Sequence, residues 1–487
     1  MGVECVQWIE YLNSIVWGAP TLCLILGLGI YFTRRLRFAQ LRLLPKSFKM
    51  LWGQFHKPAK PGEASPFSAL CTALGATVGT GNIAGVAGAI TIGGPGAVFW
   101  MWVSGFLGMI LKYAEATLAV RYRVKRNGEH LAGPMYMIQE GLGISWIPMA
   151  KMYSFFGVVA AFGVGNATQI DAVLSAVEGA AVSCGVLLPG WWMAAAGAVL
   201  AVLVYRMFSA GAGRVGELAQ KLVPAAAAAY ILLGVGVLMT CREALPGVFI
   251  EILRGAFSPR AVTGGAVYSV FTSLRVGISR GVFTNEAGMG TAAIAHGAAQ
   301  VEHPCQQGLF GIFEVFLDTI VICTITALVI LCSGIPIPYG SSAGAELTTL
   351  AIASCYGSWA GILLSASLAC FAIATILGWG LYGLRCAQYL LGDASWKQFA
   401  LLQAAVVLLG SMVRSEIIWA LAEVFNGLMA IPNLLTLWLL RFELYRLSAS
   451  FDKFFWKRSR PCGIITGAGE PAKSNCERGY HERKRTW

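Results

Sequence analysis

One stretch of the sequence combines four glycines with polar side chains inside an otherwise uncharged segment. It reads GATVGTGNIAG and runs from Gly75 to Gly85. Each glycine destabilises a helix by about 1 kcal/mol relative to alanine, and unpaired backbone at membrane depth must be buried in protein or line a cavity. We therefore expect an interrupted helix, whose free N–H groups suit an anion and whose free carbonyls suit a hard cation such as Na⁺.

A second stretch of the same kind follows about two hundred residues later. Between Gly277 and Gly290 the sequence reads GISRGVFTNEAGMG, in which glycines again alternate with polar and charged residues. Two interrupted helices in corresponding halves of a chain indicate an inverted-repeat transporter with its site between the repeats. An amino-acid zwitterion together with Na⁺ would use both kinds of freed backbone group, because the N–H groups would bind the carboxylate and the carbonyls would bind Na⁺.

Several other chemistries fit the sequence less well. Close packing of small residues explains part of the glycine pattern, but it does not explain the polar run. The segment from Gly79 to Ala84 matches the dinucleotide fingerprint G-x-G-x-x-A, yet the next acidic residue after Gly81 is Glu115, which is too distant to bind a ribose. HExxH, Walker A and CxxC patterns do not occur in the sequence, so we expect neither an enzyme nor a pump, and no metal other than sodium.

The elements that must position these stretches are membrane-spanning helices. Of the 487 residues 57% are hydrophobic and only 12% are charged, with a mean hydropathy of +0.66, whereas soluble domains are about 25% charged. We predict an all-α polytopic membrane protein with about eleven spans. The apolar runs are 8–33, 66–92, 95–120, 147–180, 190–207, 218–241, 262–297, 307–333, 357–387, 398–413 and 416–440. A shorter apolar piece, 343–353, is expected to be interfacial or re-entrant.

The order of these spans predicts the organisation of the chain. It comprises an extra N-terminal helix, a basic loop, two repeats of five helices and a basic tail. These parts are 1–33, 34–65, 66–241, 262–440 and 441–487. An odd number of spans in each repeat gives the two repeats opposite orientations.

The distribution of basic residues predicts the orientation in the membrane. With the N-terminus outside, 29 of the 36 Lys and Arg lie in inside segments and only four lie in outside loops. This asymmetry places the C-terminus in the cytoplasm. It also explains the formal charge of +12 without any nucleic-acid partner. The lipid bilayer is the expected environment, and no obligatory protein partner is evident.

The sequence resembles the alanine or glycine:cation symporters over residues 66–440. The similar segments are Gly75 to Arg123, SRGVFTNEAGMGTAAIAHGAA from Ser279, ILGW from Ile376, and FNGLMAIPN from Phe425. The resemblance implies a core of ten helices with a leucine-transporter-like fold. It also implies inward transport of alanine or glycine with Na⁺ across a prokaryotic plasma or inner membrane.

The resemblance also implies roles for individual residues. The amides of Thr80 and Gly81 are expected to bind the substrate carboxylate, and Gln169, Asn285 and Trp379 are expected to complete the pocket. The implied ligands of Na⁺ are the carbonyls of Gly75 and Val78 and the hydroxyl of Thr375, with Thr77 and Asn82 at a second cation position. Trp379 follows Thr375 by one helical turn, so it faces the same cavity and limits the size of the substrate side chain.

Two departures from the family pattern affect the expected coupling. Ala374 stands where the family usually has serine, which removes one hydroxyl from the sodium site, and Asp171 stands where asparagine is more common. A proton-coupled transporter of the same fold is therefore the alternative to sodium coupling. Glu314 and Asp318, four apart on one helical face, are its candidate proton sites; the other interpretation is that they pair with arginine or polar backbone groups within the bundle.

The remaining intramembrane charges suggest pairs. Arg280 and Glu286 flank the second glycine-rich stretch and suggest a gate or a bracing ion pair. Lys112 and Glu115 are three apart and suggest another pair, near the cytoplasmic end of their helix. His296 is expected to be structural.

Overall fold

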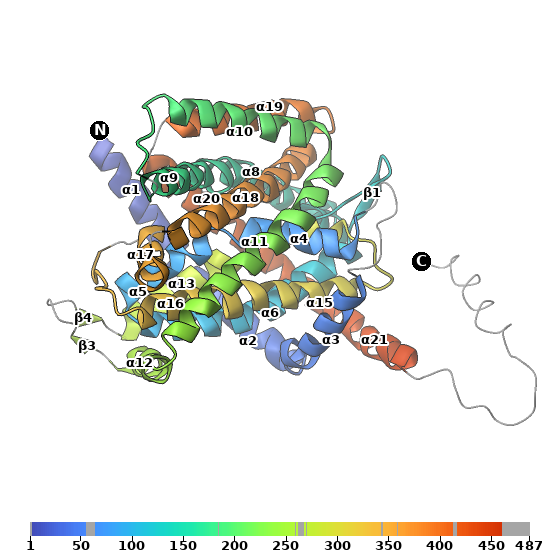
Figure 1. Ribbon diagram of the computed structural model, residues 1–487. Helices are drawn as coiled ribbons and strands as arrows, with labels where there is room; N and C mark the ends of the chain where they lie inside the picture. Colours follow the sequence, from blue (N-terminus) through green and yellow to red (C-terminus); the bar gives the residue numbers. More distant parts are fainter. Residues whose placement is uncertain are drawn as a thin grey trace, which may run out of the picture. The chain divides into compact units, whose positions relative to one another are not determined.

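The computed structural model describes residues 2–54, 64–183, 185–258, 260–261, 267–268, 270–341, 344–357, 359–412 and 416–459. These residues are almost entirely helical, as expected (Figure 1). The α-helices are α1 (Gly2–Val16), α2 (Ala19–Arg35), α3 (Ala39–Gln54), α4 (Pro66–Thr77), α5 (Ala84–Gly93), α6 (Gly96–Arg121), α7 (Pro134–Leu142), α8 (Ile147–Phe162), α9 (Thr168–Ser183), α10 (Trp192–Ser209), α11 (Ala212–Thr240), α12 (Leu245–Phe257), α13 (Val270–Asn285), α14 (Thr291–Gly297), α15 (Pro304–Val315), α16 (Thr324–Cys332), α17 (Ala345–Tyr356), α18 (Trp359–Leu391), α19 (Ser395–Met412), α20 (Glu416–Leu439) and α21 (Arg441–Ser459).

Shorter elements connect or interrupt these helices. The described residues contain two 3₁₀ turns, η1 (Thr80–Asn82) and η2 (Ile144–Trp146), and two π-helical segments, η3 (Gly163–Ala167) and η4 (Phe316–Cys323). The strands form two antiparallel hairpins, β1 (Val124–Arg126) with β2 (Glu129–Leu131) and β3 (Arg260–Ala261) with β4 (Val267–Tyr268).

Seven helical stretches of the described residues are long and apolar enough to cross a membrane. They are Tyr11–Arg35, Gly96–Arg121, Ile144–Val182, Trp192–Ser209, Ala212–Thr240, Pro304–Cys332 and Trp359–Leu391. The number rises to nine when two broken pairs are counted as single spans, and α4 with η1 and α5 is one of these pairs. The predicted count of eleven spans stays a prediction.

The structure adds helices that the apolar runs do not indicate. The first predicted span is divided at Trp17 and Gly18 into α1 and α2, the segment expected as a basic loop contains α3, and α12 lies between the two predicted repeats. The short piece predicted as interfacial or re-entrant largely coincides with α17. Residues 55–63 of the predicted loop and 460–487 of the predicted tail lie outside the described residues.

Local sequence explains where the central helices begin. The Ser65 hydroxyl accepts the Ser68 amide at 2.9 Å, and Pro66 occupies the first turn of α4, where its missing N–H costs nothing. Before α15, the His303 ring accepts the Cys305 amide at 3.2 Å and the Gln306 side chain accepts the His303 amide at 3.1 Å. These caps start both helices at a proline.

Helix α6 forms the support for the second interrupted helix. It packs against α13, α14 and α15, and Figure 1 shows α13 and α15 near it. Glycines allow the close approach: a Cβ on Gly281 would lie 2.8 Å from the Cβ of Ser104, and one on Gly311 would lie 2.8 Å from the Lys112 carbonyl oxygen. Small residues of this kind let helices pack tightly in a membrane, where lipid provides no hydrophobic driving force.

Large apolar side chains are exposed on many of the outer helices. Examples are Leu24, Phe155, Val202, Leu232 and Leu401, each more than half exposed. A surface that faces water rarely carries so many large apolar side chains. This surface is the one that a membrane-embedded protein presents to lipid.

Candidate functional site

The first glycine-rich stretch forms the interrupted helix that the sequence predicts. Helix α4 ends at Thr77, the backbone is extended at Val78 and Gly79, and α5 continues after η1 at an angle of 59° to the first half. The Gly79 amide donates to the Asn82 side-chain oxygen at 2.9 Å. The asparagine therefore caps the second half of the broken helix from within the break.

Two backbone amides in this break have no partner. The N–H groups of Thr80 and Gly81 make no hydrogen bond within the described part of the chain, and both residues are half-buried. A Cβ on Gly81 would lie 3.4 Å from the Thr284 methyl group, so the second interrupted helix is next to this point. Adjacent free amides at the start of a helical segment can bind a carboxylate.

On the other side of the break, a hydroxyl from α18 approaches the freed carbonyls. Thr375 Oγ1 donates to the Gly75 carbonyl oxygen at 3.0 Å, and a Cβ on Gly79 would lie 2.8 Å from the same hydroxyl. Ala374 is next to Gly75, because a Cβ added to Gly75 would lie 3.5 Å from the Ala374 Cβ. Carbonyl and hydroxyl oxygens of this kind suit a hard cation, and Ala374 contributes no further oxygen. Val78, whose carbonyl is another candidate ligand, is fully buried.

A third helix contributes a polar side chain to the same region. The π-helical segment η3 widens the helix just before α9, as such bulges often do at functional sites. It presents Gln169 toward the first break, where Thr80 Oγ1 lies 3.4 Å from Gln169 Oε1. The glutamine amide nitrogen is held by the Val164 carbonyl at 3.3 Å and the Thr168 hydroxyl at 3.2 Å.

The proposed second cation position looks different from the expected arrangement. Thr77 donates its hydroxyl back to its own helix, at the Ala73 and Leu74 carbonyls, and makes no hydrogen bond to Asn82 within the described residues. Asn82 instead donates to Asp318 Oδ1 at 2.6 Å. A buried carboxylate, which the sequence suggests only as an outlying proton site, is therefore part of the first break.

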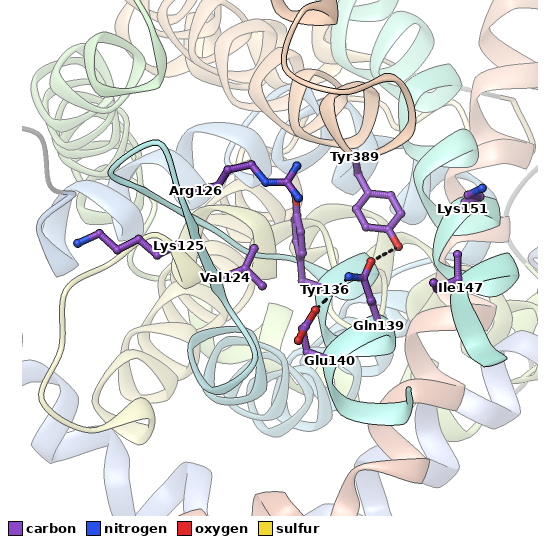
Figure 2. A pocket seen from close by; sticks show the side chains of 9 residues that line it. All are labelled: Val124, Lys125, Arg126, Tyr136, Gln139, Glu140, Ile147, Lys151 and Tyr389. Carbon is purple, nitrogen blue, oxygen red and sulfur yellow. Dashed lines mark hydrogen bonds between the residues drawn. The ribbon is translucent and has the colours of Figure 1, made fainter. Parts of the chain in front are cut away.

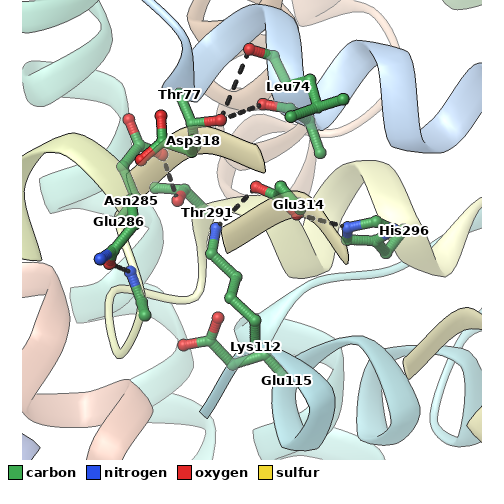
Figure 3. A network of polar contacts seen from close by, with 12 residues as sticks. Leu74, Thr77, Lys112, Glu115, Asn285, Glu286, Thr291, His296, Glu314 and Asp318 are labelled. Atoms are coloured by element: carbon green, nitrogen blue, oxygen red, sulfur yellow. Dashed lines mark hydrogen bonds and ion pairs between the residues drawn. The ribbon is translucent and has the colours of Figure 1, made fainter. Parts of the chain in front are cut away.

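The same carboxylate also connects to the second break. Asp318 Oδ2 accepts the Thr319 hydroxyl at 2.9 Å, and the Thr319 oxygen accepts the Asn285 side-chain amide at 3.1 Å. Asn285 Oδ1 in turn accepts the Ala287 amide at 2.9 Å. Asp318 lies in η4 and ties both interrupted helices to one point. Figure 3 shows Asp318 and Asn285 as parts of this network.

A carboxylate from a neighbouring helix, α6, lies at the second break. After α13 the backbone is left-handed at Glu286 (φ 53°), Gly288 (φ 93°) and Gly290 (φ 79°) before α14 begins. Glu115 Oε1, from α6, accepts the amides of Gly288 at 2.9 Å and Gly290 at 3.1 Å and the Asn433 side-chain amide at 2.7 Å. At the second break the Glu115 side chain therefore accepts the free backbone amides. The first break differs, because its two free amides have no partner among the described residues.

The aromatic residue expected to close the pocket is attached to this second break. Trp379 is fully buried in α18 and its indole N–H donates to Glu286 Oε1 at 2.8 Å. Glu286 Oε2 accepts the Thr291 hydroxyl at 2.6 Å. A Cβ on Gly165 would lie 2.3 Å from the Trp379 Cβ, so η3 packs directly against this residue.

The expected ion pair between Arg280 and Glu286 is wrong. Glu286 is occupied by Trp379 and Thr291, and Arg280 instead lies 3.7 Å from Glu423 in α20. Glu423 also accepts the Asn13 side-chain amide at 2.8 Å. These three residues line a cavity of about 380 Å³ between α1, α13 and α20, so the extra N-terminal helix reaches the cavity instead of standing apart.

The expected pair between Lys112 and Glu115 is also wrong. Lys112 makes its ion pair with Glu314 at 3.0 Å, and Glu314 also binds His296 at 2.7 Å (Figure 3). Gln307 continues the network from the His296 ring, at 2.7 Å, to the Pro66 carbonyl at 3.4 Å. Lys112, Glu314 and His296 are fully buried, so this is an internal brace at the start of α4, not a solvated helix end.

Comparison with known proteins identifies the family. The model of the sodium:alanine symporter family matches residues 3–461 of the chain. The chain belongs to this family. It is 40% identical over 446 residues to the sodium/alanine symporter AgcS of Methanococcus maripaludis, covering 90% of this chain and 95% of that protein. It is 34% identical over 432 residues to the amino-acid carrier protein AlsT of Bacillus subtilis, covering 88% and 89%.

A solved structure shows the fold of this symporter. The structure of MhsT in complex with L-phenylalanine aligns with a TM-score of 0.55 at 17% identity, covering 76% of this chain and 89% of that chain. The predicted leucine-transporter-like fold is confirmed. The symporter is thus an integral membrane protein that couples amino-acid transport to Na⁺ and is not an enzyme.

Several contacts around the two breaks have no signal in the sequence. Glu115, Asp318, Thr319, Glu423 and Asn433 make contacts to residues that are distant in the chain. The cost of a buried charge in a membrane singles out the acidic residues among them. It does not reveal their partners.

Proposed function

We propose that this symporter moves alanine or glycine into the cell together with Na⁺ by alternating access. The substrate carboxylate binds the free amides of Thr80 and Gly81, and Gln169 and Trp379 enclose the rest of the substrate. The observation that carries this proposal is the pair of amides in the first break that have no partner among the described residues, whereas at the second break Glu115 from α6 accepts the amides of Gly288 and Gly290.

The coupling Na⁺ binds on the opposite side of the same break. Its ligands are the carbonyls of Gly75 and Val78 and the hydroxyl of Thr375. Support comes from the 3.0 Å contact between the Thr375 hydroxyl and the Gly75 carbonyl oxygen, which brings two of the three groups together before any ion is added. Bound Na⁺ then holds the break in the geometry that presents the amides of Thr80 and Gly81 to the substrate, which links the two affinities.

The membrane arrangement is part of the proposal. Residues 66–241 and 262–440 form the two inverted repeats, the N-terminus lies outside, and the C-terminus lies in the cytoplasm of a prokaryotic cell. The excess of Lys and Arg in the predicted inside segments supports this orientation.

A proton-coupled transporter of the same fold is the second candidate. It is favoured by Ala374, which offers no hydroxyl beside Gly75, and by the buried carboxylates of Asp318 and Glu314 close to the breaks. Asp318 has only neutral hydrogen-bond donors within the described residues, whereas Glu314 is paired with Lys112. Asp318 is therefore the proton site under this alternative.

The Na⁺ concentration that gives half-maximal alanine uptake tests the sodium site. Thr375→Ala is expected to raise it about tenfold, since a ligand to a charged species contributes roughly 1.5–3 kcal/mol, and Thr375→Ser is expected to retain the wild-type value. Ala374→Ser is expected to lower it by restoring a hydroxyl. Ser367→Ala, on the same helix, is the control, because within the described residues that hydroxyl bonds only to the Leu363 carbonyl. An unchanged Na⁺ dependence in Thr375→Ala contradicts the assignment.

A further inference from the structure

A second cavity lies away from both interrupted helices. It has a volume of about 420 Å³ and is formed by β1, α7, the start of α8 and the end of α18. Figure 2 shows the side chains around it, which include three basic residues, Lys125, Arg126 and Lys151. Its composition differs from that of the transport site, where the groups at the first break are uncharged or acidic.

The basic residues at this cavity have no acidic partner. Within the described residues, Lys125, Arg126 and Lys151 make no ion pair. Neighbouring arginines on the same elements are used by the protein: Arg123 binds the carbonyls of Gly297 and Ala299, and Arg385 binds Glu129 at 2.7 Å. Arg123 and Arg385 are therefore bound by other groups of the protein. The side chains of Lys125, Arg126 and Lys151 have no ion-pair partner among the described residues.

The one acidic side chain at the cavity is held by its neighbours. Glu140 accepts the Gln139 amide at 3.0 Å, and Gln139 accepts the Tyr389 hydroxyl at 2.8 Å. This chain of hydrogen bonds runs along one wall, as Figure 2 shows. The cavity keeps a net positive charge because three basic residues face one carboxylate.

A buried tyrosine adds a neutral hydrogen-bond donor. Tyr136 is only 4% exposed, its ring packs edge-on against Tyr389 at 5.3 Å between centroids, and its hydroxyl has no partner among the described residues. Burial raises the pKa of Tyr136 to about 12 although the guanidiniums of Arg126 and Arg385 oppose the shift, so the hydroxyl keeps its proton. In Figure 2 the Arg126 side chain reaches toward this ring. A guanidinium and a hydroxyl together suit an oxyanion such as a phosphate.

The surface next to the cavity changes from polar to apolar. Along α8, Lys151 is followed by the exposed side chains of Met152 and Phe155, and Ile144 before the helix is 82% exposed. The stretch Ile144–Val182 is one of the helices long enough to cross a membrane. A ligand at this place therefore has water-facing basic groups at one end and a lipid-facing surface at the other.

We propose that this cavity binds the phosphate of an anionic phospholipid. The phosphate lies between Arg126, Lys151 and the Tyr136 hydroxyl, and the acyl chains follow the exposed apolar side of α8. A free phosphate offers the same charge but leaves the apolar surface uncovered. The site is independent of the transported substrate, since none of the residues that line it lies in either break.

Binding of defined lipids to the full-length protein tests the proposal. The purified protein is titrated with phosphatidylglycerol, phosphatidylcholine or inorganic phosphate, and native mass spectrometry measures the occupancy of each. We expect tight binding of phosphatidylglycerol and a roughly thirtyfold loss of affinity in Arg126→Gln/Lys151→Gln, since each basic residue near the lipid surface contributes about 1 kcal/mol. Tyr136→Phe, which keeps the ring packing, is expected to weaken binding by a smaller factor.

A charge-matched variant separates this site from general attraction to lipid. Arg214→Gln/Lys397→Gln also removes two exposed positive charges, neither of which lines the cavity, and is expected to bind phosphatidylglycerol as the wild type does. Equal losses in the two double variants overturn the proposal. Binding of inorganic phosphate as strong as that of phosphatidylglycerol overturns the assignment to a lipid. Thermal unfolding in detergent verifies that each variant is folded.

Discussion

The indole N–H of Trp379 lies 2.8 Å from a carboxylate oxygen of Glu286. This hydrogen bond joins α18 to the break between α13 and α14, at a residue whose backbone is left-handed. The orientation of the Trp379 indole is thus set by the second interrupted helix. Any rearrangement of that break must either move the indole or release it, which under the proposed function would tie substrate enclosure to the conformation of the helix.

Two substitutions of Glu286 separate hydrogen bonding from charge. Glu286→Gln retains an acceptor for the indole and a partner for the Thr291 hydroxyl, so we expect the wild-type substrate range. Glu286→Leu has similar volume and no acceptor, so it leaves the indole donor unpaired and should weaken alanine affinity about tenfold. Inhibition of labelled alanine uptake by unlabelled alanine, valine and leucine measures both effects. A wild-type range in Glu286→Leu would show that Trp379 is positioned by packing alone.

Truncation of Trp379 should enlarge the pocket. Trp379→Ala is expected to admit larger neutral amino acids, with an increase of at least about tenfold in the relative uptake of leucine, because a buried indole is replaced by open space. Trp379→Phe keeps most of the ring and is the matched control. The same competition assay applies, and an unchanged substrate range in Trp379→Ala removes this residue from the pocket.

Asp318 should affect both interrupted helices at once. Asp318→Asn replaces one of two acceptor oxygens by an amide, which leaves either the Asn82 donor or the Thr319 hydroxyl without its acceptor. A buried unsatisfied donor costs about 1–3 kcal/mol, so we expect uptake at limiting Na⁺ to fall about tenfold. Thr319→Val breaks only the connection to Asn285 and should have a smaller effect. Equal uptake by Asp318→Asn and wild type would contradict the bridging role.

The buried pair of Lys112 and Glu314 should stabilise the fold only as a pair. Lys112→Met leaves the carboxylate without its cation in a fully buried setting, which typically costs 3–5 kcal/mol. Adding Glu314→Gln removes the uncompensated charge and keeps an oxygen for His296. We expect Lys112→Met to lower the melting temperature more than Lys112→Met/Glu314→Gln does. The opposite order in thermal unfolding of the purified protein would exclude a charge-pair role.

The sequence predicts the parts of the site that depend on local composition. Glycines and polar residues in an uncharged segment locate the break after Thr77, and the resemblance places Thr375 beside Gly75, where the structure has it. These features follow from residues that are adjacent in the chain or from a shared motif. The roles proposed for them remain predictions.

The sequence does not predict which charged residues meet across the bundle. Arg280 lies close to Glu286 in the chain, yet it pairs with Glu423 because the left-handed turn directs Glu286 to Trp379. Lys112 likewise pairs across α6 and α15 with Glu314 instead of along its own helix. Spacing identifies residues that share a helix face, whereas the pairing of helices distant in sequence is set by packing of the whole bundle.

Uptake of labelled alanine into proteoliposomes tests the central claim most directly. The purified protein is reconstituted, and uptake is measured with an inward Na⁺ gradient, an inward H⁺ gradient, or neither. Sodium-coupled transport predicts accumulation above equilibrium with the Na⁺ gradient alone, although Ala374 lacks the usual hydroxyl. Accumulation with the H⁺ gradient alone would contradict it and would move the coupling site to Asp318.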